Sequence, residues 1–280
     1  MSQVPARRRP TGQHGPRSGT DGGAGREERS TNVQSVQRAV ALLVAIAESE
    51  SGASAAELAA TCRLNRATVW RVLKTLQDEG MVTMLRPSGR YVVGPTAVEI
   101  GSAGGRESLL ALARPLLHRA CELSGETASL AVLEPAGLTY VDEVTPRAVI
   151  AASWLGRTVS LHATSTGKVL LAWSEADELE HVLAEPLSRF TDTTIVDRQA
   201  LLAELAEIRD LGYARCRGEY EASLFGVSAP VLDGRGRPIV VVSLWGPGSR
   251  FGDDRWAELG ALITETARDL ERARRGGPVA

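Results

Sequence analysis

Cysteine is scarce in this chain, and its few cysteines show no pattern typical of disulfide bonds. The 280 residues include 3 cysteines, Cys62, Cys121 and Cys216, which are widely spaced and form no Cys-x-x-Cys pair. An odd number at such spacings does not suit a disulfide framework, so we expect a protein of a reducing compartment. The first residues also lack an apolar stretch typical of a signal peptide, which favours a cytoplasmic location.

Long apolar runs and metal-binding patterns are missing as well. Charge or glycine interrupts every apolar segment within about a dozen positions, whereas a membrane-crossing helix needs roughly 18 apolar residues in a row. The 4 histidines, His14, His118, His162 and His181, share no spacing typical of metal ligands. We therefore expect a soluble protein with no membrane partner, no metal and no cofactor.

The charge of the chain is unevenly distributed, although the formal net charge is only -2. Residues 1–95 contain 13 Lys and Arg against 8 Asp and Glu, a balance of +5, while residues 96–280 have a balance of -7. A basic first third joined to an acidic remainder indicates a polyanion-binding module attached to a different kind of module. A length of 280 residues with 43% hydrophobic side chains is enough for two such domains.

The first 31 residues contain almost no large apolar side chains and are rich in Gly, Pro, Arg and Ser. Such a segment cannot bury enough surface to offset its ordering entropy, so we expect a disordered basic tail that touches DNA phosphates weakly. Beyond it, apolar residues at helical spacing predict a first helix from Val36 to about Glu50. The positions that make up this stripe are Val36, Val40, Leu43, Val44 and Ala47.

Residues 54–79 have the signals of a helix-turn-helix. Ser54 and Glu57 form a capping box for a short helix that stops near Cys62. Asn65 is positioned to cap a longer helix that ends at Gly80. Residues 81–93 then predict two short strands around a turn, the wing. This order of elements predicts a winged helix-turn-helix domain over residues 32–94.

The longer helix has a basic outer face opposite its apolar stripe. A recognition helix enters the major groove, where arginine pairs with guanine and threonine packs against a thymine methyl group. Arginines beside the wing turn are suited to phosphates or the minor groove. A helical hairpin with a merely solvated basic face is the alternative, but the wing follows in the right order and favours DNA binding. The predicted DNA-binding residues are Asn65, Arg66, Thr68, Arg71, Lys74, Arg86 and Arg90.

The remainder of the chain predicts a linker over residues 95–106 and a second domain over residues 107–275. Its strands occur in adjacent runs with helices interspersed and without strict alternation, which favours an α+β domain on a mainly antiparallel sheet. We expect helices over 107–124, 197–211 and 253–274, a helix start near 166, and strands over 127–134, 138–144, 149–154, 158–163, 213–220, 225–233 and 238–246.

One pattern in this domain resembles catalytic machinery. Ser165 and Lys168 have the Ser-x-x-Lys spacing of some acyl-transfer enzymes. The companion motifs Ser-Asp-Asn and Lys-Thr-Gly are absent from the sequence, so a capping role at a helix N-terminus is favoured and no catalytic residue is predicted. The same segment fails as a phosphate loop, because His162 and Val169 occupy the positions that need glycine and a hydroxyl.

Several segments together resemble one protein family. They are VQSVQRAVALLVAIAE, SAAELAATCRLNRATVWRVLKTLQDEGMV and YVVGPTAVEIG in the first module, and GRTVSLHATSTGKVLLA, TDTTIVDRQALLAELAEIRDLGYA and FGVSAPVLDGRGRPIVVVSLWGP in the second. On these motifs the chain resembles the IclR family of bacterial transcriptional regulators over residues 33–272. The resemblance implies a second domain similar to GAF and profilin-like domains, with a small organic acid held over the sheet.

The resemblance also implies a set of effector-binding residues. Hydroxyls and backbone N–H groups at a helix N-terminus would suit a carboxylate. Cys216 and Trp245 stand where the family often has an acid and a small polar residue, which makes the site less polar and favours an aromatic effector stacked on Trp245. The alternative is that the indole itself fills the cavity. The implied residues are Leu161, His162, Ser165, Thr166, Cys216, Gly226, Ser243 and Trp245.

These observations predict a sequence-specific transcriptional regulator, by default a repressor. We expect a homodimer or a dimer of dimers on a near-palindromic double-stranded DNA operator, whose operator affinity changes when a small organic acid binds the second domain. Two other classes stay open at this stage. One is an acyl-transfer or hydrolytic enzyme that uses the Ser165 and Lys168 pair with an accessory DNA-binding module, and the other is an architectural DNA binder that senses no ligand.

Overall fold

The computed structural model describes residues 33–134, 137–146 and 153–277. The predicted tail, residues 1–31, lies outside this part of the chain, as does most of the strand predicted over 149–154. Within the described residues, no helix combines the length and apolarity that crossing a membrane requires.

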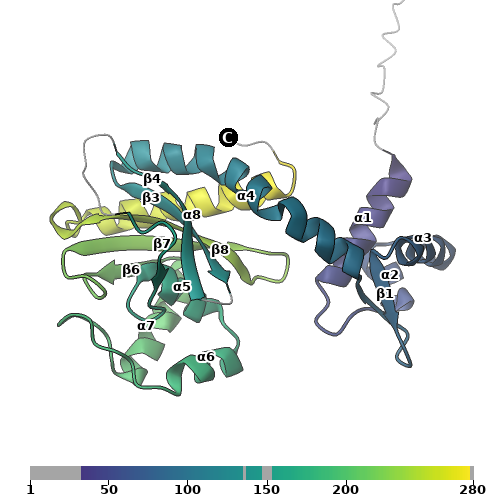
Figure 1. Cartoon of the computed structure of the whole chain (residues 1–280), viewed down its shortest axis with the longest axis horizontal. Helices are drawn as coiled ribbons and strands as arrows, with labels where there is room; N and C mark the ends of the chain where they lie inside the picture. The colour runs from purple at the N-terminus through teal and green to yellow at the C-terminus, as the bar shows by residue number, and fades with distance from the viewer. Residues whose placement is uncertain (1–32, 135–136, 147–152, 278–280) are drawn as a thin grey trace, which may run out of the picture.

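The first unit contains three helices and a two-stranded hairpin, on the right in Figure 1. The helices are α1 (Gln34–Ala47), α2 (Ala55–Thr61) and α3 (Arg66–Asp78), and the antiparallel strands are β1 (Val82–Leu85) and β2 (Arg90–Val93). The Ser54–Glu57 capping box is present, and the Asn65 side chain accepts the Thr68 N–H at the start of α3. The predicted winged helix-turn-helix is confirmed.

Helix α1 differs from the prediction in the face that it buries. Leu42 and Ile46 enter the core of the first unit, whereas Val36, Val40 and Val44 are exposed. Helix α1 therefore has two apolar faces, and the stripe predicted from the sequence combined residues of both. One packs on α2 and α3, and the other is solvent-exposed in the single chain.

The segment predicted as a linker is helical. Helix α4 runs without interruption over Pro95–Ser124, so residues 95–106 form its first turns and the helix predicted over 107–124 is its second part. Pro at the first helical position fixes a favourable φ angle, and Gly125 ends the helix with a φ of 68°. Figure 1 shows α4 extending from the first unit to the second.

The second unit is built on a six-stranded sheet in the order β5-β4-β3-β8-β7-β6, in which every pair of neighbouring strands is antiparallel. This confirms the predicted α+β class. The strand predicted over 158–163 is reduced to two residues, because the chain turns toward a helix after Val159. The strand bounds are β3 (Thr127–Glu134), β4 (Gly137–Val144), β5 (Thr158–Val159), β6 (Ala214–Arg217), β7 (Leu224–Leu232) and β8 (Pro238–Pro247).

Helices cover both faces of this sheet, so the second unit has three layers (Figure 1). Helix α4 and helix α8 (Arg255–Arg274) cover one face. A short 3-10 turn, Gly248–Arg250, precedes α8 in the chain. Helices α5 (Ser165–Trp173) and α7 (Arg198–Leu211) cover the other, and α6 (Ala176–Leu183) follows α5. Alternate strand residues enter the two cores: Val240, Val242 and Leu244 face α8, whereas Val241 faces the α5 side.

Candidate DNA-binding surface and ligand cavity

Helix α3 presents a basic and aromatic outer face. Arg66, Arg71 and Lys74, all predicted to contact DNA, are exposed on this helix. Lys74 forms an ion pair with Asp78 one turn further along. Trp70 is 65% exposed beside Arg71 and was not singled out by the sequence analysis. Trp70 therefore extends the exposed face that the arginines of α3 form.

Two other predicted residues of this helix have structural positions. Thr68 is only 8% exposed, so the prediction that it lies on the outer face is wrong. At 100° per residue Thr68 lies next to Val69 and one turn before Val72, on the side that packs into the core. Asn65 caps the helix, with its Oδ1 accepting the Thr68 N–H at 2.8 Å. It therefore fixes where α3 begins.

The two wing arginines have different environments. Arg86 is exposed next to the turn, where a phosphate could reach it. Arg90 instead donates from Nε and Nη2 to the Gly52 carbonyl oxygen at 3.0 and 2.8 Å and pairs with Glu57 at 3.1 Å. These bonds tie β2 to the loop before α2. Arg90 therefore holds the wing in place, and its contact with DNA stays a prediction.

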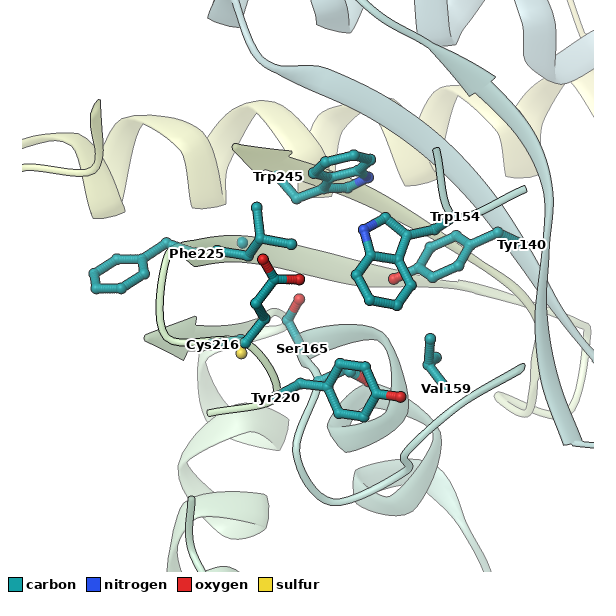
Figure 2. A pocket seen from close by; sticks show the side chains of 12 residues that line it. Tyr140, Trp154, Val159, Ser165, Cys216, Tyr220, Phe225 and Trp245 are labelled. Atoms are coloured by element: carbon teal, nitrogen blue, oxygen red, sulfur yellow. The ribbon is translucent and has the colours of Figure 1, made fainter. Parts of the chain in front are cut away.

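A cavity lies between the sheet and the N-terminal end of α5. It has about 430 Å³ of empty space, including part of its open mouth. Figure 2 shows Tyr140, Trp154, Tyr220 and Trp245 around it, with Ser165 at its base. The lining residues are Tyr140, Trp154, Val159, Thr164, Ser165, Cys216, Tyr220, Glu221, Leu224, Phe225, Gly226 and Trp245.

Four of the predicted effector-binding residues line this cavity: Ser165, Cys216, Gly226 and Trp245. The Cys216 Sγ lies 3.4 Å from the Ala163 carbonyl oxygen, and burial, together with the nearby Glu219 charge, raises the pKa of this thiol. Cys216 is therefore a neutral wall of the cavity.

Two more predicted residues lie directly beneath the lining, in a buried cluster of hydroxyl groups. Thr166 Oγ1 is 2.9 Å from both Tyr140 Oη and Ser243 Oγ and 3.2 Å from Ser228 Oγ. Ser228 Oγ then donates to Ser165 Oγ at 2.8 Å. Burial raises the pKa of Tyr140 to about 12, so its phenol remains a neutral hydrogen-bonding group. The cluster joins α5 to β4, β7 and β8 below the cavity.

The last two predicted residues, Leu161 and His162, do not line the cavity. His162 is buried, with Nε2 2.9 Å from the Ser188 carbonyl oxygen and Nδ1 3.1 Å from Ser160 Oγ. Leu161 lies on a separate apolar groove with Leu133 and Leu170. The residues that approach α5 thus shape the loop that carries Thr164 and Ser165, and only those two reach the cavity.

One lining residue carries a polar atom without a partner. Trp245 is 8% exposed, and its Nε1 is buried with no hydrogen-bond partner among the described residues. Ser129 Oγ, on the neighbouring strand, has the same status. Buried donors of this kind are rare in folded proteins. Within the described part of the chain, the Trp245 N–H on the wall of the cavity therefore has no acceptor.

Sequence reasoning missed most of the aromatic lining. Tyr140 follows the period of β4 and could have been found as an inward position, since the burial of β4 alternates along the strand. Trp154, Tyr220 and Glu221 come from loops. The strands predicted over 149–154 and 213–220 therefore placed Trp154 and Tyr220 wrongly, since β6 ends at Arg217 and Trp154 is in no strand. Phe225 directly precedes the predicted Gly226.

The Ser-x-x-Lys pattern does not form a catalytic pair. Lys168 has 0% exposure, and its Nζ contacts Glu219 at 2.8 and 2.9 Å and Glu204 at 2.5 Å. Burial by itself lowers the pKa of Lys168, but the two carboxylates outweigh it and raise the pKa. The ammonium group therefore stays protonated, and Ser165 takes its hydrogen bond from Ser228 instead.

Side chains at the turn between β7 and β8 contact the first unit. Arg235 donates to the Ala47 carbonyl oxygen at the C-terminal end of α1, and Arg237 contacts Glu50 at 3.5 Å and Glu175 at 3.0 Å. A guanidinium group at a helix C-terminus is favoured by the helix dipole. These contacts join β7 and β8 to the C-terminal end of α1 in the first unit.

Over residues 33–134, 137–146 and 153–277, no three His, Cys, Asp or Glu side chains are grouped so that they could hold a metal ion.

Two family models match the chain. Residues 35–85 match the IclR helix-turn-helix domain, and residues 103–272 match the bacterial transcriptional regulator IclR C-terminal domain. The second match alone covers more than half of the chain.

Curated relatives and solved structures agree with these matches. The HTH-type transcriptional regulator BhcR of Paracoccus denitrificans is 36% identical over 255 residues, 90% of this chain and 91% of that protein. The acetate operon repressor of Salmonella typhimurium is 32% identical over 86% of this chain and 90% of its own length. The crystal structure of Thermotoga maritima IclR has a TM-score of 0.57 at 27% identity, over 85% of this chain and 97% of that one.

Proposed function

Because the chain belongs to the IclR family of bacterial transcriptional regulators, we propose that it represses transcription by binding an operator through helix α3, and that a small organic ligand in the cavity changes this binding. Its relatives are transcriptional regulators and repressors, so the chain is a regulator and the enzyme alternative is set aside. Repression is supported by relatives named as repressors, among them AllR of Escherichia coli at 29% identity over 86% of this chain.

The observation that carries the DNA-binding proposal is the outer face of α3. Arg66, Trp70 and Arg71 are exposed together on a helix whose other face is buried in the core. An arginine in this position can donate two hydrogen bonds to one guanine, and the indole can pack against a thymine methyl group or the sugar edge. Arg86 on the wing would add a phosphate contact.

A second copy of the chain fits the exposed valine face of α1. Val36, Val40 and Val44 recur every four residues on one side of the helix and are all exposed. Two such faces related by a two-fold axis would cover each other, and a dimer of this kind would read two half-sites. A Val40→Glu variant would then shift the chain toward monomer in sedimentation experiments, while Leu42 and Ile46 still hold the first unit together.

The ligand proposal rests on the cavity and on what lies beneath it. The hydroxyl cluster below Ser165 includes residues of β7 and β8, and the turn between these strands contacts α1. A ligand that moves α5 relative to the sheet therefore changes strands that touch the DNA-binding unit. The predicted organic acid draws support from the N-terminal end of α5. The aromatic lining supports an aromatic or apolar ligand more strongly, since no Lys, Arg or His is among the lining residues.

The test of the proposal is the affinity of the purified protein for DNA from upstream of its own gene. Arg71→Ala is expected to weaken binding by roughly 1 to 3 kcal/mol if Arg71 reads a base. Arg268→Ala, which removes an exposed arginine from α8 on the far side of the sheet, is the matched control and should bind like the parent. Equal binding by both variants over a range of salt concentrations would refute the assignment of α3.

A further inference from the structure

Aromatic residues make up a large part of the cavity lining. Five of its twelve lining residues are aromatic. Trp154 and Tyr220 meet edge to face, with ring centroids 5.6 Å apart. Tyr140 and Trp245 complete the wall from β4 and β8, whereas the Phe225 ring points away from the cavity and packs on Phe251 and Trp256 (Figure 2). Rings in such an arrangement direct several electron-rich faces and edges toward one volume.

The charge of the lining is negative. Glu221 is the only lining residue among Asp, Glu, Lys, Arg and His. Its Oε1 accepts a hydrogen bond from Ser223 at 3.1 Å. A second carboxylate, Glu143, accepts the Trp154 backbone N–H at 2.9 Å. An organic anion entering this space would meet the Glu221 carboxylate without a cationic side chain to balance it.

The nearby cations are already engaged. Lys168 is bound by Glu219 and Glu204 beneath Cys216, and this trio has one more negative than positive charge. The Arg157 guanidinium carbon lies 5.5 Å from the centroid of the Trp154 ring, and Arg157 is not a lining residue. That contact shows that this indole already attracts a cation.

We propose that the cavity binds a small quaternary ammonium compound, with its trimethylammonium group among the aromatic rings and beside Glu221. A desolvated cation of this kind is attracted by tryptophan and tyrosine faces and needs no hydrogen-bond acceptor. The proposal rests on the proposed function, because it names the ligand class of the same regulatory cavity. It departs from the organic acid expected from the family resemblance.

The polar end of the ligand is defined by the other side of the cavity. The Trp245 Nε1 donor has no partner among the described residues, and Ser165 Oγ lies on the same lining. A hydroxyl or carboxylate oxygen a few bonds from the ammonium nitrogen would give that N–H an acceptor. Choline and glycine betaine both have this chemistry.

The test is isothermal titration calorimetry on the full chain with four probes. Choline and glycine betaine carry the proposed group, 3,3-dimethylbutan-1-ol is the uncharged carbon analogue of choline, and benzoate is an aromatic acid. The expected result is binding of choline or glycine betaine, with the uncharged analogue weaker by about tenfold or more, because the cation–π and carboxylate attractions are lost.

Two variants assign the binding to these residues. Glu221→Gln and Trp154→Leu should each weaken binding of the ammonium probe by about tenfold. Glu265→Gln, which changes an exposed glutamate of α8 on the other face of the sheet, is the matched control and should leave it unchanged. Thermal unfolding of each variant separates a lost contact from a lost fold.

Each remaining outcome overturns the ligand class. Equal binding of choline and its uncharged analogue would show that charge is not recognised. An effect of Glu221→Gln no larger than that of Glu265→Gln would show the same. Benzoate binding without ammonium binding would refute the proposed ligand class, and so would no binding of any probe at millimolar concentration. Neither result would contradict the proposal that the protein is a ligand-regulated repressor. Failure of the proposed function itself would appear separately, as a chain that does not bind its upstream DNA.

Discussion

Replacing Lys168 by methionine should destabilise the second unit strongly, although the two side chains have similar lengths. The Lys168 side chain is fully buried, and the side chain of its partner Glu219 is only 7% exposed. Methionine leaves little empty volume, so the variant removes the charge and leaves Glu219 buried without a counter-ion. Breaking a buried ion pair from one side costs about 3 to 5 kcal/mol. In a domain of this size that corresponds to a fall in Tm of roughly 6 to 20 °C.

The size of this loss should depend on pH in one direction. Burial raises the pKa of Glu219, and the charge of Lys168 opposes that rise, so the pKa is higher still in Lys168→Met. A carboxyl whose pKa is higher in the folded than in the unfolded state destabilises the fold at high pH and is relieved as it gains a proton. The difference in Tm between the variant and the parent should therefore be largest at neutral pH and shrink as the pH falls through the folded pKa of Glu219.

Thermal unfolding followed by circular dichroism at neutral and mildly acidic pH measures this difference. The double variant Lys168→Met with Glu219→Gln removes both charges, so it should recover much of the lost stability, since Glu204 is one-quarter exposed and can turn to water. A single variant as stable as the parent, or a deficit that is the same at both pH values, would refute the account of Lys168 as a structural cation.

Two further substitutions test how the wing and the cavity are held. Arg90→Ala should lower the stability of the first unit by about 1 to 3 kcal/mol, because the Gly52 carbonyl loses two donors and Glu57 loses its partner. Urea unfolding measures this loss. A variant that loses DNA affinity at unchanged stability would contradict the structural role of Arg90. Gly167→Ala should destabilise the protein by about 1 to 3 kcal/mol, since the added Cβ would lie 2.3 Å from the Leu161 carbonyl oxygen. Gly101→Ala is the control, because a Cβ there meets nothing within 4 Å, and it should raise the Tm. The opposite order of the two Tm values would disprove the packing at α5.

Local signals predicted the first unit well. The capping box at Ser54, the cap at Asn65 and the turn between the wing strands are set by residues within a few positions of each other, so the sequence alone indicates them. The faces of the helices were harder. Val40 was assigned to the buried side of α1 because that helix has apolar residues on two faces. Thr68 was assigned to the outer face of α3, although it lies next to Val69 on the buried side.

The cavity was predictable only in part, for the same physical reason. Ser165, Cys216, Gly226 and Trp245 lie on regular elements whose register the family resemblance supplies. The rest of the lining depends on loops far apart in the chain. Trp154 meets Tyr220 across 66 positions, and Glu221 follows in the same loop. Their approach depends on the fold of the whole sheet, which no local pattern in the sequence encodes.

The most direct measurement of the central claim is nuclease protection of the DNA upstream of the gene, by the parent and by Arg71→Ala at equal concentrations. The account predicts two protected segments related by a two-fold axis, one for each α3 of a dimer, that fade together in Arg71→Ala while the variant keeps the parent's Tm. Protection that is absent in the parent, or that is unchanged in Arg71→Ala, would contradict it.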